Sequence, residues 1–215
     1  MNALFITFEG GEGSGKTTQI NRLAQTLSQI GRKVVTTREP GGTPEGEKIR
    51  DLIVRRDAGN WIPMAEVLLF LAARIMHVEK IIKPALEEGH IVICDRFADS
   101  TTAYQGYGHG VDQHILEETN TLALGHFKPD LTFVLDIDPE EGLKRSDRRL
   151  AAEQFQVKER EDRYEQLDIE FHKRLRQGFL DIAAKEPERC HVIDATQDID
   201  AISAQVARIV SERIG

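Results

Sequence analysis

The most informative segment of this 215-residue chain is Glu9-Gly10-Gly11-Glu12-Gly13-Ser14-Gly15-Lys16-Thr17-Thr18. It follows a short apolar run at positions 4–8 and precedes apolar residues that recur at helical spacing between positions 20 and 27. The segment fits G-x-x-x-x-G-K-[ST] between a strand and a helix, which is the pattern of a phosphate-binding loop. The alternative, an ordinary glycine-rich turn between a strand and a helix, is disfavoured by this context.

The residue types in this segment suit the phosphates of a nucleotide. Glycines let the backbone turn tightly, so that successive amide N–H groups point into one concavity at the start of a helix, where the helix dipole attracts anions. Lys16 would reach the terminal phosphates, and the hydroxyl of Thr17 would bind Mg²⁺. The residues expected to contact the nucleotide here are Gly10, Gly11, Glu12, Gly13, Ser14, Gly15, Lys16, Thr17 and Thr18.

The rest of the chain alternates between short apolar runs and longer segments with helical periodicity. The alternation predicts an α/β fold with a five-stranded parallel sheet and helices on both faces. Together with the phosphate-binding loop after the first strand, it indicates a fold of the P-loop NTPase type. Right-handed crossovers would bring the carboxyl ends of all strands to one edge, where ligands bind. No repeat or linker divides the chain, so we expect one domain over residues 1–215. The expected strands lie at 4–8, 33–37, 91–94, 131–135 and 191–193, and the later helices at 44–56, 64–88, 112–124, 139–148, 164–185 and 199–214.

The composition is that of an ordinary globular protein, with 40% hydrophobic and 30% charged residues. The net charge of −8 argues against a general binder of nucleic acids or anionic membranes. Cys94 and Cys190 have no metal-binding or redox spacing, which fits a reducing compartment. The first residues lack the basic region of a signal peptide, and no apolar run reaches membrane-spanning length. We therefore expect a cytoplasmic protein without nucleic-acid or membrane partners.

Three charged residues end strands at the expected ligand edge. Asp95 closes the third strand, as the acidic partner of a phosphate-loop Mg²⁺ site does, although a helix cap or a surface aspartate would look the same. Arg38 and Arg96 end the second and third strands, and two guanidinium groups at one edge suit a second phosphate group. A single arginine at a strand end is usually solvated or ion-paired, so this inference depends on the pair. It favours an acceptor substrate that carries a phosphate.

Two further patterns leave alternatives open. The charge-dense region from about 146 to 163 is either a solvated, ion-paired hairpin or a mobile lid that brings an arginine to the transferring phosphoryl group. Phe70 and Arg74 share a helix face, either as a core pair or as a base-binding pair, and spacing alone does not decide between them. The arginines of the charged region are Arg145, Arg148, Arg149, Arg160 and Arg163.

Taken together, the motifs resemble those of the thymidylate kinase family, over residues 4–196. The phosphate loop with its preceding Phe8 resembles the first signature of that family. Thr37-Arg38-Glu39-Pro40-Gly41-Gly42-Thr43 resembles the second. The third is matched by Asp95-Arg96-Phe97 with Ser100 and by Ala103-Tyr104-Gln105-Gly106, with Phe97 where Tyr or His is more usual. Pro129-Asp130-Leu131 and Gly142-Leu143-Lys144-Arg145 match as well.

The resemblance implies that a homodimer transfers the γ-phosphoryl group of ATP to dTMP, with Mg²⁺, on the route to dTTP. In that family the positions of Arg38 and Arg96 hold the acceptor phosphate, and the position of Glu12 contacts the sugar 3′-hydroxyl. Phe70 would stack on thymine, Arg74 would contact a base carbonyl, and Arg145 would stack on adenine. The positions that line base and deoxyribose are Ser100, Thr101, Tyr104 and Gln105.

The resemblance also implies a source for the charge needed at the transition state. Some members of the family carry a catalytic arginine within the phosphate loop, but here Gly13 follows Glu12. The chain is therefore similar to the bacterial type, which supplies the arginine from the lid at the position of Arg149. Residues 150–157 are longer and less glycine-rich than is usual, so the choice among Arg148, Arg149 and Arg160 stays open. The implied catalytic residues are Lys16, Arg38, Arg96 and Arg149.

Two other functions fit parts of the pattern. One is a P-loop kinase for a different nucleoside monophosphate, which the Phe70, Arg74 and Tyr104-Gln105 positions would distinguish. The other is a non-enzymatic P-loop nucleotide switch, which would leave the paired arginines unexplained. The sequence also lacks the guanine-binding pattern Asn-Lys-x-Asp that many such switches carry.

Overall fold

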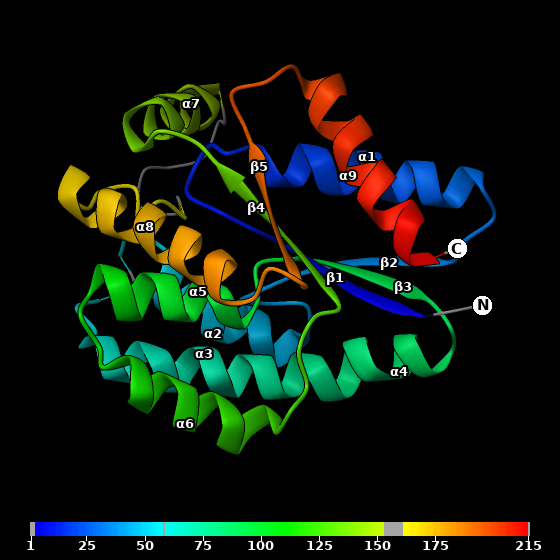
Figure 1. Cartoon of the computed structure of the whole chain (residues 1–215). Coiled ribbons are helices and arrows are strands. Elements are labelled where there is room, and N and C mark those ends of the chain that lie inside the picture. The colour runs from blue at the N-terminus through cyan, green and yellow to red at the C-terminus, as the bar shows by residue number, and fades with distance from the viewer. Residues whose placement is uncertain (1–2, 58, 153–160, 215) are drawn as a thin grey trace.

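The computed structural model describes residues 3–57, 59–152 and 161–214, except the side chain of Arg149. Five strands form one sheet in the order β2-β3-β1-β4-β5, and all neighbouring strands are parallel (Figure 1). The sheet predicted from the sequence is therefore confirmed. The strands are β1 (Leu4–Glu9), β2 (Val34–Arg38), β3 (Ile91–Asp95), β4 (Leu131–Asp136) and β5 (Cys190–Asp194).

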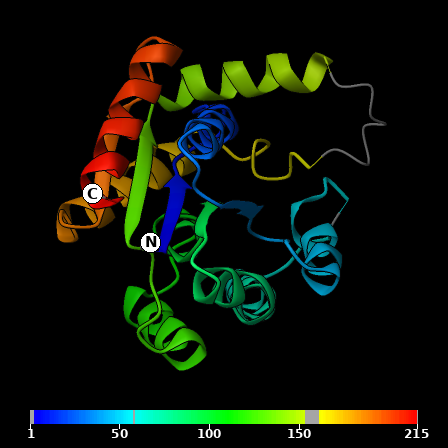
Figure 2. The ribbon, with the colours of Figure 1, turned by 90° about the vertical axis from the view of Figure 1, so that its right-hand side faces the viewer.

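Helices cover both faces of the sheet because the side chains of its central strands alternate between two apolar cores. Leu4, Ile6 and Phe8 of β1 pack toward α1 (Lys16–Gln29) and α9 (Ile199–Ile214), whereas Phe5 packs toward the opposite face. Figure 2 shows the sheet between these two layers. The helices of the opposite layer and the connections are α2 (Pro44–Val54), α3 (Pro63–His77), α4 (Lys83–Glu87), α5 (Ala98–Thr101), α6 (Gln113–Leu124), α7 (Pro139–Ala152) and α8 (Ile169–Lys185).

Two helical features differ from the sequence expectation for local reasons. The long helix expected at 64–88 is continuous, but it contains the wide π-helical turn η1 (Val78–Ile82) directly before Pro84. A proline cannot donate the backbone hydrogen bond of a regular turn, and the wider turn accommodates this loss. The helix expected from 164 begins instead at Ile169, because the Asp168 carboxylate accepts a 2.7 Å hydrogen bond from the Phe171 amide and caps it.

Residues 98–108, between the third strand and the helix at 113–124, are helical. They consist of α5 and a second π-helical segment, η2 (Thr102–Gly108), which packs against α8. Gly108 makes this packing possible, since a Cβ atom there would lie 2.4 Å from the Phe171 ring. The helix pair thereby brings the side chains of η2 toward the ligand edge of the sheet.

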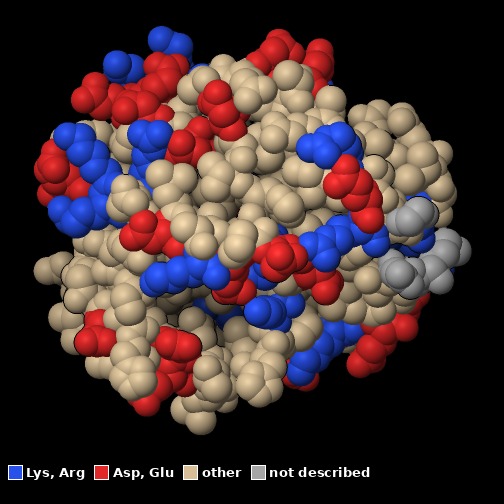
Figure 3. All heavy atoms as spheres, in the orientation of Figure 1, with Lys and Arg blue, Asp and Glu red and all other residues tan. Residues whose placement is uncertain are grey.

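The strand register determines which residues meet at that edge. Arg38 pairs with Asp95 across β2 and β3, and Phe8 pairs with Asp95 across β1 and β3. The phosphate loop begins directly after Glu9, the last residue of β1, at the same end of the sheet. On the face shown in Figure 3, acidic and basic side chains are interspersed. Within the described parts of the chain, no helix combines the length and the apolar character needed to cross a membrane.

Candidate active site

The phosphate loop depends on glycines that take backbone angles unfavourable for other residues. Gly10, Gly13 and Gly15 have φ angles of 130°, 66° and 91°, and α1 begins directly after Gly15. At Gly13 there is also no room, because a Cβ atom would lie 2.0 Å from the carbonyl oxygen of Gly142 in α7. A Cβ atom at Gly142 would in turn lie 2.4 Å from the carbonyl oxygen of Glu12. The loop and α7 therefore touch through backbone alone.

Lys16 lies over the loop that precedes it. Its Nζ atom donates to the carbonyl oxygens of Gly10 (3.2 Å) and Gly11 (3.0 Å), and the side chain is largely buried. Burial lowers the pKa of Lys16, and the neighbouring Arg96 lowers it further. An anion placed in the loop would offset both effects, so the arrangement is suited to a phosphate.

Thr17 and Asp95 form an oxygen pair beside the loop. The Thr17 hydroxyl donates to Asp95 Oδ2 at 3.3 Å. The other carboxylate oxygen, Oδ1, is buried and has no hydrogen-bond partner among the residues described. Hydroxyl and carboxylate oxygens are the ligands that Mg²⁺ prefers, and a buried oxygen without a partner is a vacant acceptor.

Arg96 connects the end of β3 with the phosphate loop. It has a φ angle of 69°, which orients its guanidinium group so that Nη1 donates to the Gly10 carbonyl at 3.0 Å and Nη2 to Glu12 Oε1 at 2.9 Å. The Tyr104 hydroxyl also donates to Glu12, and its ring lies 5.0 Å from the guanidinium carbon. Burial alone would raise the pKa of Glu12, but Arg96 and Lys16 lower it to about 2. Glu12 is therefore ionised at neutral pH.

Arg38 lies farther out, at the mouth of the same cleft. Its side chain is about half exposed and its Nη2 atom pairs with Glu47 Oε2 at 2.9 Å. Glu47 also accepts a hydrogen bond from the Gly42 amide, at 3.0 Å, which shapes the loop after β2. Because this pair is exposed to solvent, Arg38 can exchange its partner for a ligand phosphate at low cost.

Arg74 is buried on α3 with one nitrogen unused. Its Nε atom donates to Glu39 Oε2 (2.7 Å), and its Nη2 atom donates to the Phe97 carbonyl (3.1 Å) and the Thr101 hydroxyl (3.0 Å). The Nη1 atom is buried and has no hydrogen-bond partner within the described chain. Glu39 is itself held by His77, whose Nδ1 atom lies 3.0 Å from Glu39 Oε1.

Gln105 is the counterpart of Arg74 on η2. Its Nε2 atom donates to Glu66 Oε2 (3.0 Å) and to the Tyr164 hydroxyl (3.2 Å). Its Oε1 atom is buried without a hydrogen-bond partner in the described residues. Buried polar atoms in native proteins are nearly always paired, and Arg74 and Gln105 line the same cleft, so the free nitrogen of one and the free oxygen of the other together suit a ligand in that cleft.

One large cleft, with a volume of about 1200 Å³, brings these groups together. This is more than the roughly 300–1,000 Å³ of a site for one small ligand, so the cleft has room for two. Arg145 contacts Glu141 at 3.1 Å and the Ala195 carbonyl at 3.1 Å, and also borders the cleft. The predicted site residues that line it are Glu12, Gly13, Ser14, Gly15, Lys16, Thr17, Thr18, Arg38, Phe70, Arg74, Asp95, Arg96, Ser100, Thr101, Tyr104, Gln105 and Arg145.

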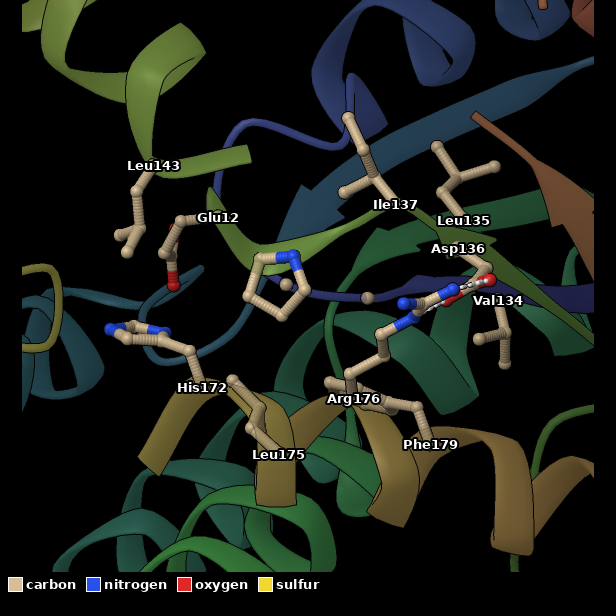
Figure 4. Close-up of a pocket in the computed structure, with 13 residues that line it drawn as sticks. Glu12, Val134, Leu135, Asp136, Ile137, Leu143, His172, Leu175, Arg176 and Phe179 are labelled. Atoms are coloured by element: carbon tan, nitrogen blue, oxygen red, sulfur yellow. Dashed lines mark hydrogen bonds and ion pairs between the residues drawn. The ribbon is translucent and has the colours of Figure 1, made fainter. Parts of the chain in front are cut away.

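Gly10 and Gly11 line a smaller cavity behind the loop. Figure 4 shows Glu12 and His172 at one end of this cavity and the ion-paired Arg176 and Asp136 at the other. The space open to the centre of a water-sized molecule is about 20 Å³, enough for a single water. Gly10 and Gly11, both predicted to contact the nucleotide, are not among the residues that line the large cleft, and their carbonyl oxygens instead accept hydrogen bonds from Lys16.

The charged region of the expected lid is described only in part. Helix α7 extends to Ala152, four residues beyond the expected end, and residues 153–160 lie outside the described structure. That segment includes Arg160, and the side chain of Arg149 is also not described. After residues 153–160, Glu161 pairs with Arg50 of α2 at 2.5 Å, and the buried Asp162 pairs with Arg56, which follows α2. The C-terminal end of the charged region is thus ion-paired to α2 and to the residues directly after that helix.

Three buried carboxylates near the cleft, Glu9, Glu39 and Glu66, were not identified as site residues from the sequence. Glu9 is fully buried at the end of β1 and accepts hydrogen bonds from the Phe97 amide (2.7 Å) and the Ser100 hydroxyl (2.5 Å). It therefore holds the turn that carries Arg96. The available signal was an acidic residue directly after an otherwise apolar strand, although its partners lie about 90 residues away in the chain.

A phosphate loop and an arginine-lined second compartment in one cleft define a P-loop phosphotransferase of the nucleoside monophosphate kinase class. Residues 8–206 match the family model for thymidylate kinase. The chain belongs to the thymidylate kinase family.

Relatives and a solved structure agree over nearly the whole chain. The thymidylate kinase of Caulobacter vibrioides is 46% identical over 211 residues, which cover 98% of this chain and 97% of that protein. The thymidylate kinase of Geobacter sulfurreducens is 47% identical over 212 residues, with the same coverage. The crystal structure of thymidylate kinase from Ehrlichia chaffeensis is similar with a TM-score of 0.78 at 41% identity, and covers 98% of this chain and 99% of that one.

Glu9 makes the stability of the fold depend on pH. Burial, assisted by the charge of Asp99, raises its pKa from 4.5 to about 8, which outweighs the opposing hydrogen bonds from Ser100 and the Phe97 amide. Between these two pH values the folded chain holds a proton that the unfolded chain has released, so the contribution of Glu9 falls as pH rises. We expect the free energy of unfolding of the wild type, minus that of Glu9→Gln, to decrease steadily from pH 5 to pH 8 in urea titrations.

The exposed Glu188→Gln variant is the matched control, because it makes the same substitution without changing a buried side chain, and the pH trend of Glu9→Gln is measured relative to it. If the free energy of unfolding of the wild type, minus that of Glu9→Gln, is constant or grows with pH, the folded protein holds the Glu9 carboxyl group ionised.

Proposed function

We propose that this chain transfers the γ-phosphoryl group of ATP to dTMP and forms dTDP and ADP, a step in the synthesis of dTTP. One observation carries the choice of acceptor. The second compartment of the cleft contains a buried donor, Arg74 Nη1, and a buried acceptor, Gln105 Oε1, that both lack partners in the described chain. The 4-carbonyl and N3–H of thymine present the complementary acceptor and donor.

The same pair disfavours cytosine. Cytosine carries an amino group in place of the 4-carbonyl and a bare nitrogen at position 3, so donor would face donor and acceptor would face acceptor. Leaving a buried polar group unpaired costs about 1–3 kcal/mol, and a site built to hydrogen-bond its substrate rejects mismatched analogues strongly. Phe70, on the same cleft wall, offers a ring for stacking on the base.

The phosphate groups would lie at the ligand edge of the sheet. Arg96 and Arg38 hold the phosphate of dTMP, and Glu12 accepts a hydrogen bond from its 3′-hydroxyl. The ATP phosphates occupy the loop beside Lys16, with the adenine toward Arg145. Phosphoryl transfer needs in-line positioning and neutralisation of charge on the moving group rather than covalent chemistry, and the loop amides and Lys16 supply part of that charge.

Thr17 and Asp95 would hold the Mg²⁺ ion. Their adjacent oxygens, one of them without a hydrogen-bond partner in the described chain, support this assignment. When bound, the ion neutralises charge on the β- and γ-phosphates. In the described residues no group of three or more His, Cys, Asp or Glu could hold a metal. We propose that nucleotide phosphates and water complete the coordination.

The remaining charge would come from Arg149, on a lid of about residues 146–163. Gly13 offers no side chain in the loop, and α7 carries Arg149 in the turn before the helix ends at Ala152. Lid closure would exclude water and bring the arginine to the transferring group.

We also infer a homodimer in the cytoplasm. Large apolar side chains are exposed on the neighbouring helices α3 and α6, at Leu68, Ile75, Ile115 and Leu122, and a second copy of the chain would cover them. Cys94 and Cys190 are free and buried, which suits a reducing compartment.

A substrate panel tests the proposed acceptor. ADP release with ATP and Mg²⁺ should be measured against dTMP, dUMP, CMP, UMP, AMP and GMP. We expect dTMP to have the highest kcat/KM. A preference for any other acceptor, or slow turnover with none, would contradict the proposal.

A second variant tests the lid arginine. Losing an arginine that stabilises the transition state costs about 10³–10⁵ in rate, so Arg149→Ala should lower kcat severely and leave the affinity for dTMP nearly unchanged. Arg148→Ala and Arg160→Ala are the matched controls. An unchanged kcat in Arg149→Ala, with a loss in either control, would move the role to that residue.

The dimer is tested by light scattering during size-exclusion chromatography. The wild type should have about twice the 24.2 kDa mass of one chain. Leu68→Glu should shift the protein to the monomer, because it places a charge on the face that the second copy would cover. Ile30→Glu, at an exposed apolar position at the end of α1, should leave the dimer intact, and equal masses for the two variants would argue against this face.

A further inference from the structure

Glu66 is a carboxylate buried to 1% exposure on α3, one helical turn before Phe70 and two before Arg74. Its Oε1 atom accepts a hydrogen bond from Arg163 Nη2 at 2.5 Å. Its Oε2 atom accepts from Gln105 Nε2 and from the Tyr164 hydroxyl, each at 3.0 Å. Burying a carboxylate is costly even when it is paired, so its presence beside the base compartment requires an explanation.

Anchoring Arg163 alone does not explain Glu66. Arg163 also donates through Nη1 to the Ile53 carbonyl at 3.0 Å, and its guanidinium group lies 5.4 Å from the Tyr164 ring. Glu66 gives Gln105 something that its other partner does not, because the Tyr164 hydroxyl can donate or accept whereas a carboxylate can only accept. A primary amide can take two orientations that exchange its oxygen and its nitrogen, and its surroundings must select one of them.

Glu66 selects the orientation of Gln105 because a carboxylate paired with an arginine can only accept hydrogen bonds. In the observed orientation both N–H groups of Gln105 are used, one by Glu66 and one by the Tyr164 hydroxyl. Rotating the amide by half a turn would place its oxygen against Glu66 Oε2, acceptor against acceptor. The orientation that remains leaves Oε1 buried and free for a ligand.

The arrangement around Arg74 follows the same rule. Glu39 accepts from Arg74 Nε at 2.7 Å and is itself buried, and the nitrogen left free is Nη1. Arg74 and Gln105, each of which has one buried atom without a hydrogen-bond partner in the described chain, are therefore each held by a buried carboxylate. One carboxylate leaves a donor free and the other leaves an acceptor free.

We propose that Glu66 is a specificity-determining positioning residue, which keeps the carbonyl oxygen of Gln105 directed at N3 of the base and so favours thymine over cytosine. The proposal rests on the dTMP assignment made above. Glu66 does not touch the nucleotide and acts through Gln105.

The sharpest probe is the pair dTMP and 5-methyl-dCMP, which share the methyl group, sugar and phosphate and differ only at position 4 and in the hydrogen at N3. In Glu66→Gln the residue can either donate or accept, so both orientations of Gln105 become available. We expect the ratio of kcat/KM for dTMP to that for 5-methyl-dCMP to fall about tenfold, the effect of about one hydrogen bond. The change should appear as a higher KM for dTMP, with KM for ATP unchanged.

Two further variants separate orientation from a general structural role. The exchange variant E66Q/Q105E puts a carboxylate at position 105, which presents an acceptor however it is held, and should restore the ratio to within about threefold of the wild type. Tyr164→Phe removes a hydroxyl from the same cluster but keeps Glu66, and should retain the ratio. Gln105→Leu provides the reference for complete loss of the acceptor.

An unchanged ratio of kcat/KM for dTMP to that for 5-methyl-dCMP in Glu66→Gln overturns the proposal. An equal loss of this ratio in Glu66→Gln and Tyr164→Phe overturns it as well. If Glu66→Gln does not fold, the exchange variant decides, and a ratio as low as that of Gln105→Leu overturns the proposal. A wild type that does not prefer dTMP to 5-methyl-dCMP contradicts the proposed substrate instead, so the two failures are distinguishable.

Discussion

The ion pair between Arg96 and Glu12 joins the end of β3 to the phosphate loop, and the rest of the cleft is arranged around it. Both side chains are largely withdrawn from water, so each needs further partners, which the Gly10 carbonyl and the Tyr104 hydroxyl supply. Breaking a buried pair leaves one charge uncompensated at a cost of about 3–5 kcal/mol, somewhat less where water still reaches it. The pair and its partners therefore hold the end of β3 against the phosphate loop.

Buried carboxylates extend this arrangement outward from the sheet. Glu9 holds the turn after β3, Glu39 holds Arg74, and Glu66 holds Gln105. Each acts on a residue that lies far from it in the chain. Glu9 does so in its protonated form at neutral pH, by holding the Phe97 amide and the Ser100 hydroxyl. Glu39 and Glu66 instead restrict the polar side chains of Arg74 and Gln105, which lowers the entropy that binding would otherwise cost.

The features that could be predicted from the sequence are those with a local cause. The phosphate loop follows from glycine geometry, the sheet from apolar runs of strand length, and the convergence of Arg38, Asp95 and Arg96 from parallel topology. The roles of Glu9, Glu39 and Glu66 could not be predicted, because an isolated acidic residue has the same appearance whether it is solvated or buried, and their partners are distant. Helical details also had local causes, which are the wide turn before Pro84 and the cap at Asp168. Glu12 and Phe70 were linked to the acceptor through the family resemblance, since neither spacing nor composition identified them.

The backbone contact between Gly13 and Gly142 has a consequence for how such enzymes can diverge. An arginine in the phosphate loop needs a Cβ atom where the carbonyl of Gly142 now lies, so it could be accommodated only if α7 moved away. The same helix carries Arg149 toward the region of the lid. A side chain at position 13 and the present position of α7, which carries Arg149, are therefore incompatible on this backbone. A lineage could pass from one source of charge to the other only through coupled changes in the loop and in α7, and a single substitution at position 13 would disrupt the existing contact before the new arginine could contribute.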